Sequence, residues 1–135
     1  MLITVSTTIN APLALVWSAW HTPSDIESWN FANDDWCCPL ARSDFRVGGE
    51  FSYQMAAKDG SMSFDFNGQF TEVVPMQRIA YVIADGRKVS IDFVETASGV
   101  TITEQFEAEQ THPAELQQQG WQSILDNFKS YVLSL

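Results

Sequence analysis

Glu104 is the acidic residue whose place in the sequence most clearly predicts chemistry. It alternates in phase with Ile102 and Phe106, so a strand through these residues would turn its carboxyl toward an apolar face. Burial raises the pKa of a carboxyl that has no partner, and such a group can donate or accept a proton near neutral pH. We therefore take Glu104 as the best candidate for a catalytic residue, with Tyr53 or Tyr81 as an assisting hydroxyl.

Two alternatives would instead place the Glu104 carboxyl in solvent: a strand that leaves the core at this point, or a β-bulge that shifts the alternation. The other charged residues fall in the opposite phase and are expected to point outward, as Asp65 does between two phenylalanines. Asp44 and Arg46 are expected to form a weak cross-strand surface pair rather than a ligand-binding one. The neighbouring Gly48-Gly49 would let the sheet bend.

Nucleophiles and metal ligands are scarce. The histidines are His21 and His112, and the cysteines are the adjacent pair Cys37 and Cys38. Neighbouring residues are too close for an ordinary disulfide, so both thiols are expected to be free, in a reducing compartment. No spacing typical of a zinc site occurs, and His21 has no matched nucleophile. We expect no metal, no cofactor and an ordinary position for His21 at a helix end.

The composition narrows the class of partner. The 135 residues suit one domain, residues 1–135, and the net charge of −10 argues against nucleic acid and against an anionic membrane surface. Residues 1–12 have neither the basic start nor the apolar run of a signal peptide, and no stretch has the length of a membrane span. These features predict a cytoplasmic protein. The 13% aromatic content suits a large core or an apolar cavity.

Hydrophobic periodicity predicts one strand, two short helices, a run of strands and a long helix. Strand-like alternation covers residues 2–9 and then 45–55, 64–74, 79–83, 89–93 and 100–106, with Gly-containing turns between the later strands. Asn10 is expected to cap a helix with Pro12 in its first turn, followed by a helix over residues 24–29. Residues 30–40 are expected to form a loop. Connections this short favour antiparallel neighbours.

The terminal helix is predicted over Pro113–Leu133. Leu116, Ile124 and Phe128 are spaced in multiples of four residues, which places them on one face. A helix of roughly 20 residues is about 30 Å long, enough to cross a sheet. A curved sheet closed by such a helix would enclose a cavity. Trp29 and Trp36 would then form either a lid over the mouth of this cavity or a plug that fills that end.

Four segments of the chain resemble one family in the right order. Residues 43–51, Ser-Asp-Phe-Arg-Val-Gly-Gly-Glu-Phe, resemble the D-x-R-x-G-G-x-F signature of the SRPBCC superfamily, in the branch named after the activator of the heat shock protein 90 ATPase. Residues 10–17, 66–75 and 120–128 are similar to the first helix, a central strand and the terminal helix of that branch. At the start of the last helix, His112 stands where the family often has Asn.

The resemblance implies an α+β helix-grip fold. In this fold a seven-stranded curved antiparallel sheet wraps around the long C-terminal helix, and two short helices after the first strand close one end. The space between helix and sheet often holds an apolar ligand. The side chains expected to line it, by inward phase, are Trp20, Trp29, Trp36, Phe51, Tyr53, Met55, Phe64, Phe66, Phe70, Tyr81, Ile91, Phe93, Ile102, Glu104, Trp121, Leu125 and Phe128.

Three functions follow as hypotheses. The leading one is non-catalytic binding of a small hydrophobic molecule, lipid-like or polyketide-like, because inward polar groups are scarce. The second is an enzyme of the cyclase or hydrolase type that uses Glu104 as acid or base, since a fold does not fix a function. The third, a co-chaperone of heat shock protein 90, is the least expected because the chain is strongly acidic. A homodimer is left open.

Overall fold

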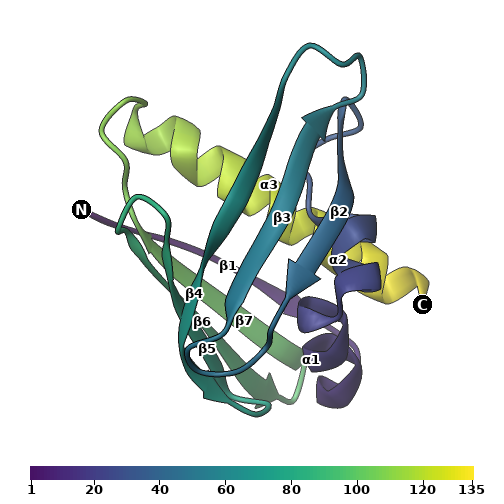
Figure 1. Cartoon of the computed structure of the whole chain (residues 1–135). Helices are drawn as coiled ribbons and strands as arrows, with labels where there is room; N and C mark the ends of the chain where they lie inside the picture. Colours follow the sequence, from purple (N-terminus) through teal and green to yellow (C-terminus); the bar gives the residue numbers. More distant parts are fainter.

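The computed structural model describes all 135 residues, and it has one seven-stranded antiparallel sheet and three helices (Figure 1). The strands lie in the order β1-β7-β6-β5-β4-β3-β2. The elements are β1 (Leu2–Ile9), α1 (Leu13–His21), α2 (Pro23–Trp29), β2 (Trp36–Ser43), β3 (Glu50–Ala57), β4 (Ser63–Val74), β5 (Arg78–Ile83), β6 (Lys88–Thr96), β7 (Gly99–Glu107) and α3 (Ala114–Ser134). The predicted α+β helix-grip fold is confirmed.

The strands form where the sequence alternates, because one face of the sheet is covered and the other is not. In β7, Val100, Ile102, Glu104 and Phe106 are buried, and the residues between them are more exposed. Pairing of β7 with β1 and with β6 continues past Glu104 without a register shift. The two alternatives that would have turned Glu104 to solvent are therefore wrong.

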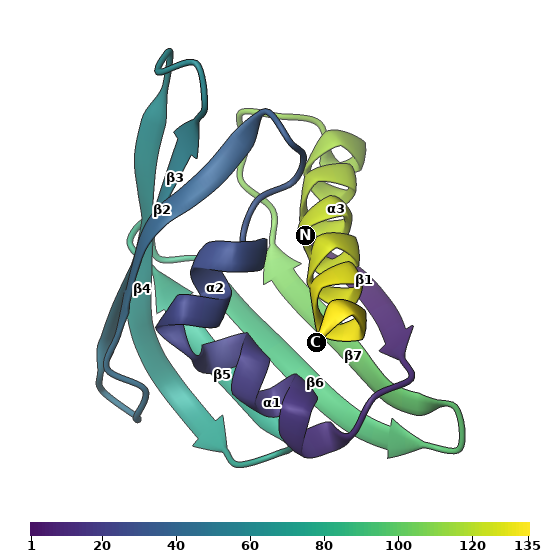
Figure 2. The ribbon, with the colours of Figure 1, turned by 90° about the vertical axis from the view of Figure 1, so that its right-hand side faces the viewer.

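The helices cover the concave face of the sheet. Figure 2 shows α1 and α2 between the β2–β3–β4 side of the curled sheet and α3. The buried residues of α3 are Leu125, Phe128 and Val132, all in its C-terminal half, whereas Leu116 in its first turn is 53% exposed. The stripe predicted from Leu116 onward is therefore fully buried only from Leu125 to Val132, although Trp121 also packs against the core.

Polar side chains hold α3 onto the segment that follows α2. The Asn127 Nδ2 donates to the backbone oxygens of Trp29 and Phe31, at 2.9 and 3.3 Å. The Tyr131 hydroxyl donates to the Asp25 carboxylate on α2. A buried carbonyl needs a donor, so these contacts fix where the helix crosses the sheet.

Helix side chains also bond to the backbone of both edge strands. The Nε2 atoms of Gln118 and Gln122 on α3 donate to the carbonyl oxygens of Thr4 and Ser6 on β1, at 3.3 and 3.0 Å. At the opposite edge, the Ala41 N–H on β2 donates to the Glu27 carboxylate of α2 at 2.9 Å. Unpaired edge groups are templates for further strand pairing, so these bonds close the sheet at each side.

The predicted cap of the first helix is wrong. The cap position of α1 is Pro12, with extended backbone (φ −62°, ψ 140°), and no side chain caps the helix, so Asn10 is not the cap. α3 begins at Ala114 directly after Pro113, within one residue of its predicted start, and no side chain caps it either. In both cases the fixed φ of proline sets the turn into the helix, which removes the need for a capping side chain.

The loop predicted over residues 30–40 is too long, because β2 begins at Trp36. The alternation there is broken by a register shift between Cys37 and Leu40, where Pro39 lacks the N–H that pairing requires.

The segment from Phe45 to Gly49 was predicted as strand but is a turn between β2 and β3. Gly48 has φ +84°, and a Cβ on Gly49 would lie 1.9 Å from the Asp44 carbonyl oxygen, so only glycine fits. The Gly48 N–H donates to the Phe70 oxygen at 2.8 Å, and the Phe70 N–H to the Gly49 oxygen at 2.9 Å. The glycine pair therefore docks the turn onto β4.

The ion pair of Asp44 and Arg46 lies within this same turn, so it is local and not cross-strand. The Arg46 Nε donates to both Asp44 carboxylate oxygens at 2.9 and 3.0 Å, and both side chains are exposed. Exposed pairs of this kind contribute little to stability.

The Asn127 contacts generate a testable prediction. Asn127→Ala is expected to lower the free energy of unfolding by about 1–2 kcal/mol, because the backbone oxygens of Trp29 and Phe31 each lose a hydrogen bond from the Asn127 amide. Gln119→Ala, on the exposed face of the same helix, is the control and should change it by less than about 0.5 kcal/mol. Urea unfolding measures both. Wild-type stability of Asn127→Ala would mean that apolar packing alone holds α3.

Candidate functional site

A pocket of about 270 Å³ lies between the concave face of the sheet and the middle of α3. Nine of its twelve lining residues are hydrophobic. The lining residues are Trp20, Trp29, Asn30, Met55, Phe64, Phe66, Tyr81, Arg87, Glu104, Trp121, Ile124 and Leu125. They come from all three helices, from β3, β4, β5 and β7, and from the segments after α2 and before β6. The pocket therefore exists only in the folded chain.

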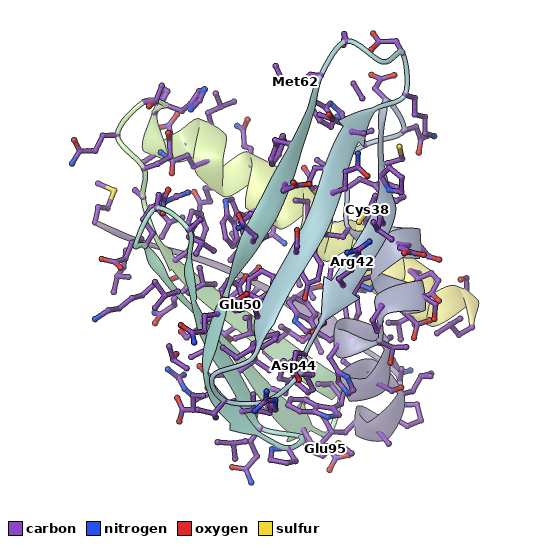
Figure 3. All side chains as sticks on the ribbon, in the orientation of Figure 1. Cys38, Arg42, Asp44, Glu50, Met62 and Glu95 are labelled. Carbon is purple, nitrogen blue, oxygen red and sulfur yellow. The ribbon has the colours of Figure 1, made fainter.

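A second depression, of about 510 Å³, lies on the outer face of the sheet. Its walls include Arg42 and Glu50, which Figure 3 labels on β2 and β3, together with Asn67 and Gln69 on β4. No helix covers these residues. The inner pocket is the better candidate site because burial and apolar walls favour a small ligand.

Aromatic contacts fix the walls of the inner pocket. Trp121 on α3 stacks on Phe106 of β7, with ring centroids 3.9 Å apart and 10° between the ring planes. Trp20 and Trp29 lie 5.0 Å apart, and the Trp29 Nε1 donates to the Ala19 oxygen at 3.0 Å. Because each of these rings is held by a neighbouring ring or by a hydrogen bond, the pocket is largely preformed.

The carboxyl of Glu104 is the acidic group of the pocket. Its side chain is on the middle of β7, paired with Val5 on β1 and with Ile91 on β6, and only 6% of the residue is exposed. Burial raises the pKa of this carboxyl from an ordinary value of 4.5 to about 8, and no charge or hydrogen bond from the protein offsets it. The group can therefore hold a proton at neutral pH and give it to a base, or to water when a nearby positive charge stabilises the carboxylate.

Three further polar side chains border the pocket. Tyr81 is 9% exposed, and the pKa of its hydroxyl is raised by burial first and by the nearby Glu104 charge second. Asn30, also 9% exposed, donates to the Met55 sulfur at 3.3 Å. Arg87 lies at the rim between β5 and β6. None of these groups forms a hydrogen bond with Glu104.

Nine side chains that the sequence placed in the cavity lie at this pocket. They are Trp20, Trp29, Met55, Phe64, Phe66, Tyr81, Glu104, Trp121 and Leu125. The other eight do not border it. They are Trp36, Phe51, Tyr53, Phe70, Ile91, Phe93, Ile102 and Phe128.

The physical reason for this division is packing. Phe51 contacts Phe70 and Tyr81 at ring distances of 5.1 and 4.8 Å, so these rings pack against one another on the concave face. Phe93 contacts Trp17 at 5.2 Å beneath α1. Trp36 lies near the β3–β4 hairpin and contacts Phe64 at 6.0 Å. The solid part of the core is thus made by the same residue types as the pocket wall.

The sequence-based list missed Asn30, Arg87 and Ile124. Ile124 follows the helical spacing and could have been added from it. Asn30 directly follows α2 and Arg87 is in a turn, and no periodic signal applies to either.

The remaining candidates lie elsewhere. His21 at the end of α1 stacks on Phe45, with ring centroids 4.2 Å apart, and burial lowers its pKa. Cys37 and Cys38 are free thiols. No group of three or more His, Cys, Asp or Glu side chains is close enough to bind a metal ion. None of the helices is both long and apolar enough to pass through a membrane.

Comparison with known proteins identifies relatives of the whole chain. A family model described as "Activator of Hsp90 ATPase homolog 1-like protein" matches residues 10–133. The solution structure of an AHSA1-like protein from Aeromonas hydrophila has 45% sequence identity and a TM-score of 0.94, covering 99% of this chain and 93% of that one. A solution structure from Cytophaga hutchinsonii has 48% identity and a TM-score of 0.85, covering 98% and 92%.

A crystal structure from Nitrosomonas europaea has 20% identity and a TM-score of 0.85, covering 99% of this chain and 95% of that one, and it shows the fold alone. No curated protein matches the chain.

The buried carboxyl predicts how stability depends on pH. In the unfolded chain Glu104 ionises near its ordinary pKa of 4.5, whereas in the folded chain it keeps its proton up to about 8. Its contribution to stability is therefore complete below pH 4.5 and is lost as the pH rises to about 8, by up to about 5 kcal/mol. Glu104→Gln carries no such charge and should become more stable than the wild type over this range.

Urea unfolding between pH 4 and 9 measures the difference. Glu95→Gln is the matched control, since Glu95 is exposed near the end of β6 (Figure 3), and it should follow the wild type at every pH. A constant difference between Glu104→Gln and the wild type across this range would contradict the raised pKa.

Proposed function

Because the chain belongs to the family of activator of Hsp90 ATPase homolog 1-like proteins, we propose that it binds a small apolar or amphipathic molecule in the pocket beneath α3. The observation that supports this most directly is the pocket itself, about 270 Å³ with nine hydrophobic lining residues of twelve. Small-molecule sites in proteins commonly measure about 300–1,000 Å³. The ligand should thus be compact, a molecule of one or two rings or a short lipid-like or polyketide-like chain.

Burial of apolar ligand surface would supply the affinity, at roughly 25 cal/mol per Å², reduced by the loss of motion on association. Binding is also favoured because the aromatic rings of the pocket are already held in place. Trp121 is already stacked on Phe106, and Trp29 is already hydrogen bonded to Ala19. Little side-chain ordering would remain to oppose binding.

An acid–base enzyme is the second candidate, and one observation favours it. The Glu104 carboxyl has a pKa of about 8 in a pocket that Tyr81 also lines, and general acids work best when their pKa lies near the working pH. The reaction would be proton transfer to or from a bound substrate by the Glu104 carboxyl. Turnover of any substrate should then fall with Glu104→Gln.

We also propose that the protein works in the cytoplasm. Its two cysteines are free and adjacent, a state that a reducing compartment preserves.

Filling the pocket tests the binding function. Ile124 lines the pocket from α3, so Ile124→Trp should occupy the space a ligand needs. The neutral fluorophore prodan is the probe, and its affinity should fall at least tenfold in a fluorescence titration. Leu116→Trp makes the same change at an exposed position of α3 and should leave the affinity within about twofold.

Thermal unfolding shows whether each variant folds. If Ile124→Trp folds and still binds prodan like the wild type, the ligand does not occupy this pocket.

A further inference from the structure

We propose that the pocket selects small aromatic amines in their cationic form, with the Glu104 carboxylate as the counter-charge. This rests on the proposed function, because it names the class of molecule that the same pocket binds. Three features of the pocket carry it: an acidic group without a partner, a basic group whose charge is already paired, and walls rich in aromatic rings.

The first feature is that Glu104 has no partner within the protein. The residue is only 6% exposed and faces the pocket. None of the five ion pairs in the structure includes it, and desolvation alone shifts its titration. A buried carboxylate without a counter-charge is unfavourable, so a ligand that brings a positive charge gains the interaction that the protein leaves unmade.

The second feature is that no basic group of the protein competes for Glu104. Arg87 is the one basic side chain at the pocket. Its Nε donates to the Asp85 carboxylate at 2.8 Å, and its Nη1 donates to the backbone oxygen of Glu107 at 3.2 Å. Its charge is thus paired at the rim. An anionic ligand would find little free positive charge to bind.

The other elements around Glu104 contribute no base. β1 and β6 face it with Val5 and Ile91, and α3 contributes Trp121, Ile124 and Leu125 to the pocket. The titratable group on β5 is Tyr81. The charge of Glu104, and to a smaller extent that of Tyr53 on β3, adds to the increase in the pKa of its hydroxyl that burial causes. Both tyrosines are neutral at physiological pH because burial raises the pKa of each hydroxyl.

The third feature is the aromatic wall. Half of the twelve lining residues are aromatic, and these are Trp20, Trp29, Phe64, Phe66, Tyr81 and Trp121. Ring faces attract cations within about 6 Å of the centroid, and tryptophan is the strongest of them. A cationic amine would gain from both the rings and the ionised Glu104 carboxyl, and an alcohol would lack the charge. An anionic ligand would be disfavoured by the ring faces and could not pair with an ionised Glu104. The net charge of −10 also attracts cations toward the surface.

Binding should be linked to proton release. In the empty pocket at pH 7 the Glu104 carboxyl is protonated, and the amine arrives as an ammonium ion, since alkylammonium groups have a pKa of about 10. On binding, the carboxyl gives its proton to the solvent and forms an N–H⁺···O⁻ hydrogen bond with the ligand. One proton is thus released for each amine bound, and affinity should rise with pH up to about 8 and fall once the amine loses its own charge.

The test uses three ligands with one aromatic skeleton: phenethylamine, phenethyl alcohol and hydrocinnamate. Calorimetric titration of the full chain at pH 7, in two buffers of different ionisation enthalpy, gives affinity and proton release together. Phenethylamine should bind at least tenfold more tightly than the other two and release close to one proton. Phenethyl alcohol should release none.

Glu104→Gln keeps the shape of the side chain and removes its charge. It should lose at least tenfold in affinity for phenethylamine and all of the proton release, while phenethyl alcohol binds within about threefold of the wild type. Glu95→Gln, exposed on β6, should bind all three ligands as the wild type does. Proton release by the wild type is a second measurement that needs no variant.

The outcomes separate this inference from the proposed function. If prodan and phenethyl alcohol bind the wild type but phenethylamine is not preferred, or if Glu104→Gln binds phenethylamine unchanged, the amine selectivity is wrong and the binding function stands. If neither prodan nor any of the three ligands binds, both are wrong.

Discussion

Docking of the C-terminal half of α3 on the concave face of the sheet is the interaction on which the rest of the structure depends. Leu125, Phe128 and Val132 are buried there, and Asn127 and Tyr131 bond to the segment around α2. The helix closes the curled sheet without filling it, since Trp121, Ile124 and Leu125 of its middle part line a pocket of about 270 Å³. The pocket is the space left by that closure.

The same closure explains why one carboxyl stands out. Every inward position of β7 is covered by helices and neighbouring strands, so Glu104 is buried with Ile102 and Phe106 although it is acidic. A folded chain keeps such a residue at the expense of stability at neutral pH. A buried acidic group that lowers stability is expected where the group serves binding or proton transfer rather than folding.

The most distinctive family signature, residues 43–51, acts in the fold rather than in the pocket. The run around Gly48 and Gly49 makes a turn that only glycine permits and that bonds to β4. The Asp44–Arg46 pair is exposed in the same turn. This signature is therefore informative about architecture and says nothing of the ligand. The family-like segments 66–75 and 120–128, in contrast, contribute Phe66, Trp121, Ile124 and Leu125 to the pocket.

Strand alternation by itself determined which faces point inward and that Glu104 would share the apolar face of β7, and the four-residue spacing of Leu116, Ile124 and Phe128 determined that a long helix would follow the sheet. These properties are local, since they depend on neighbours two to four residues apart. Only the tertiary structure decided that Tyr81 borders the pocket while Phe51 fills the core, and that Asn30 and Arg87 reach the site. The position of a void depends on where α3 crosses the sheet and on the summed volumes of side chains from distant segments, and no local period encodes either.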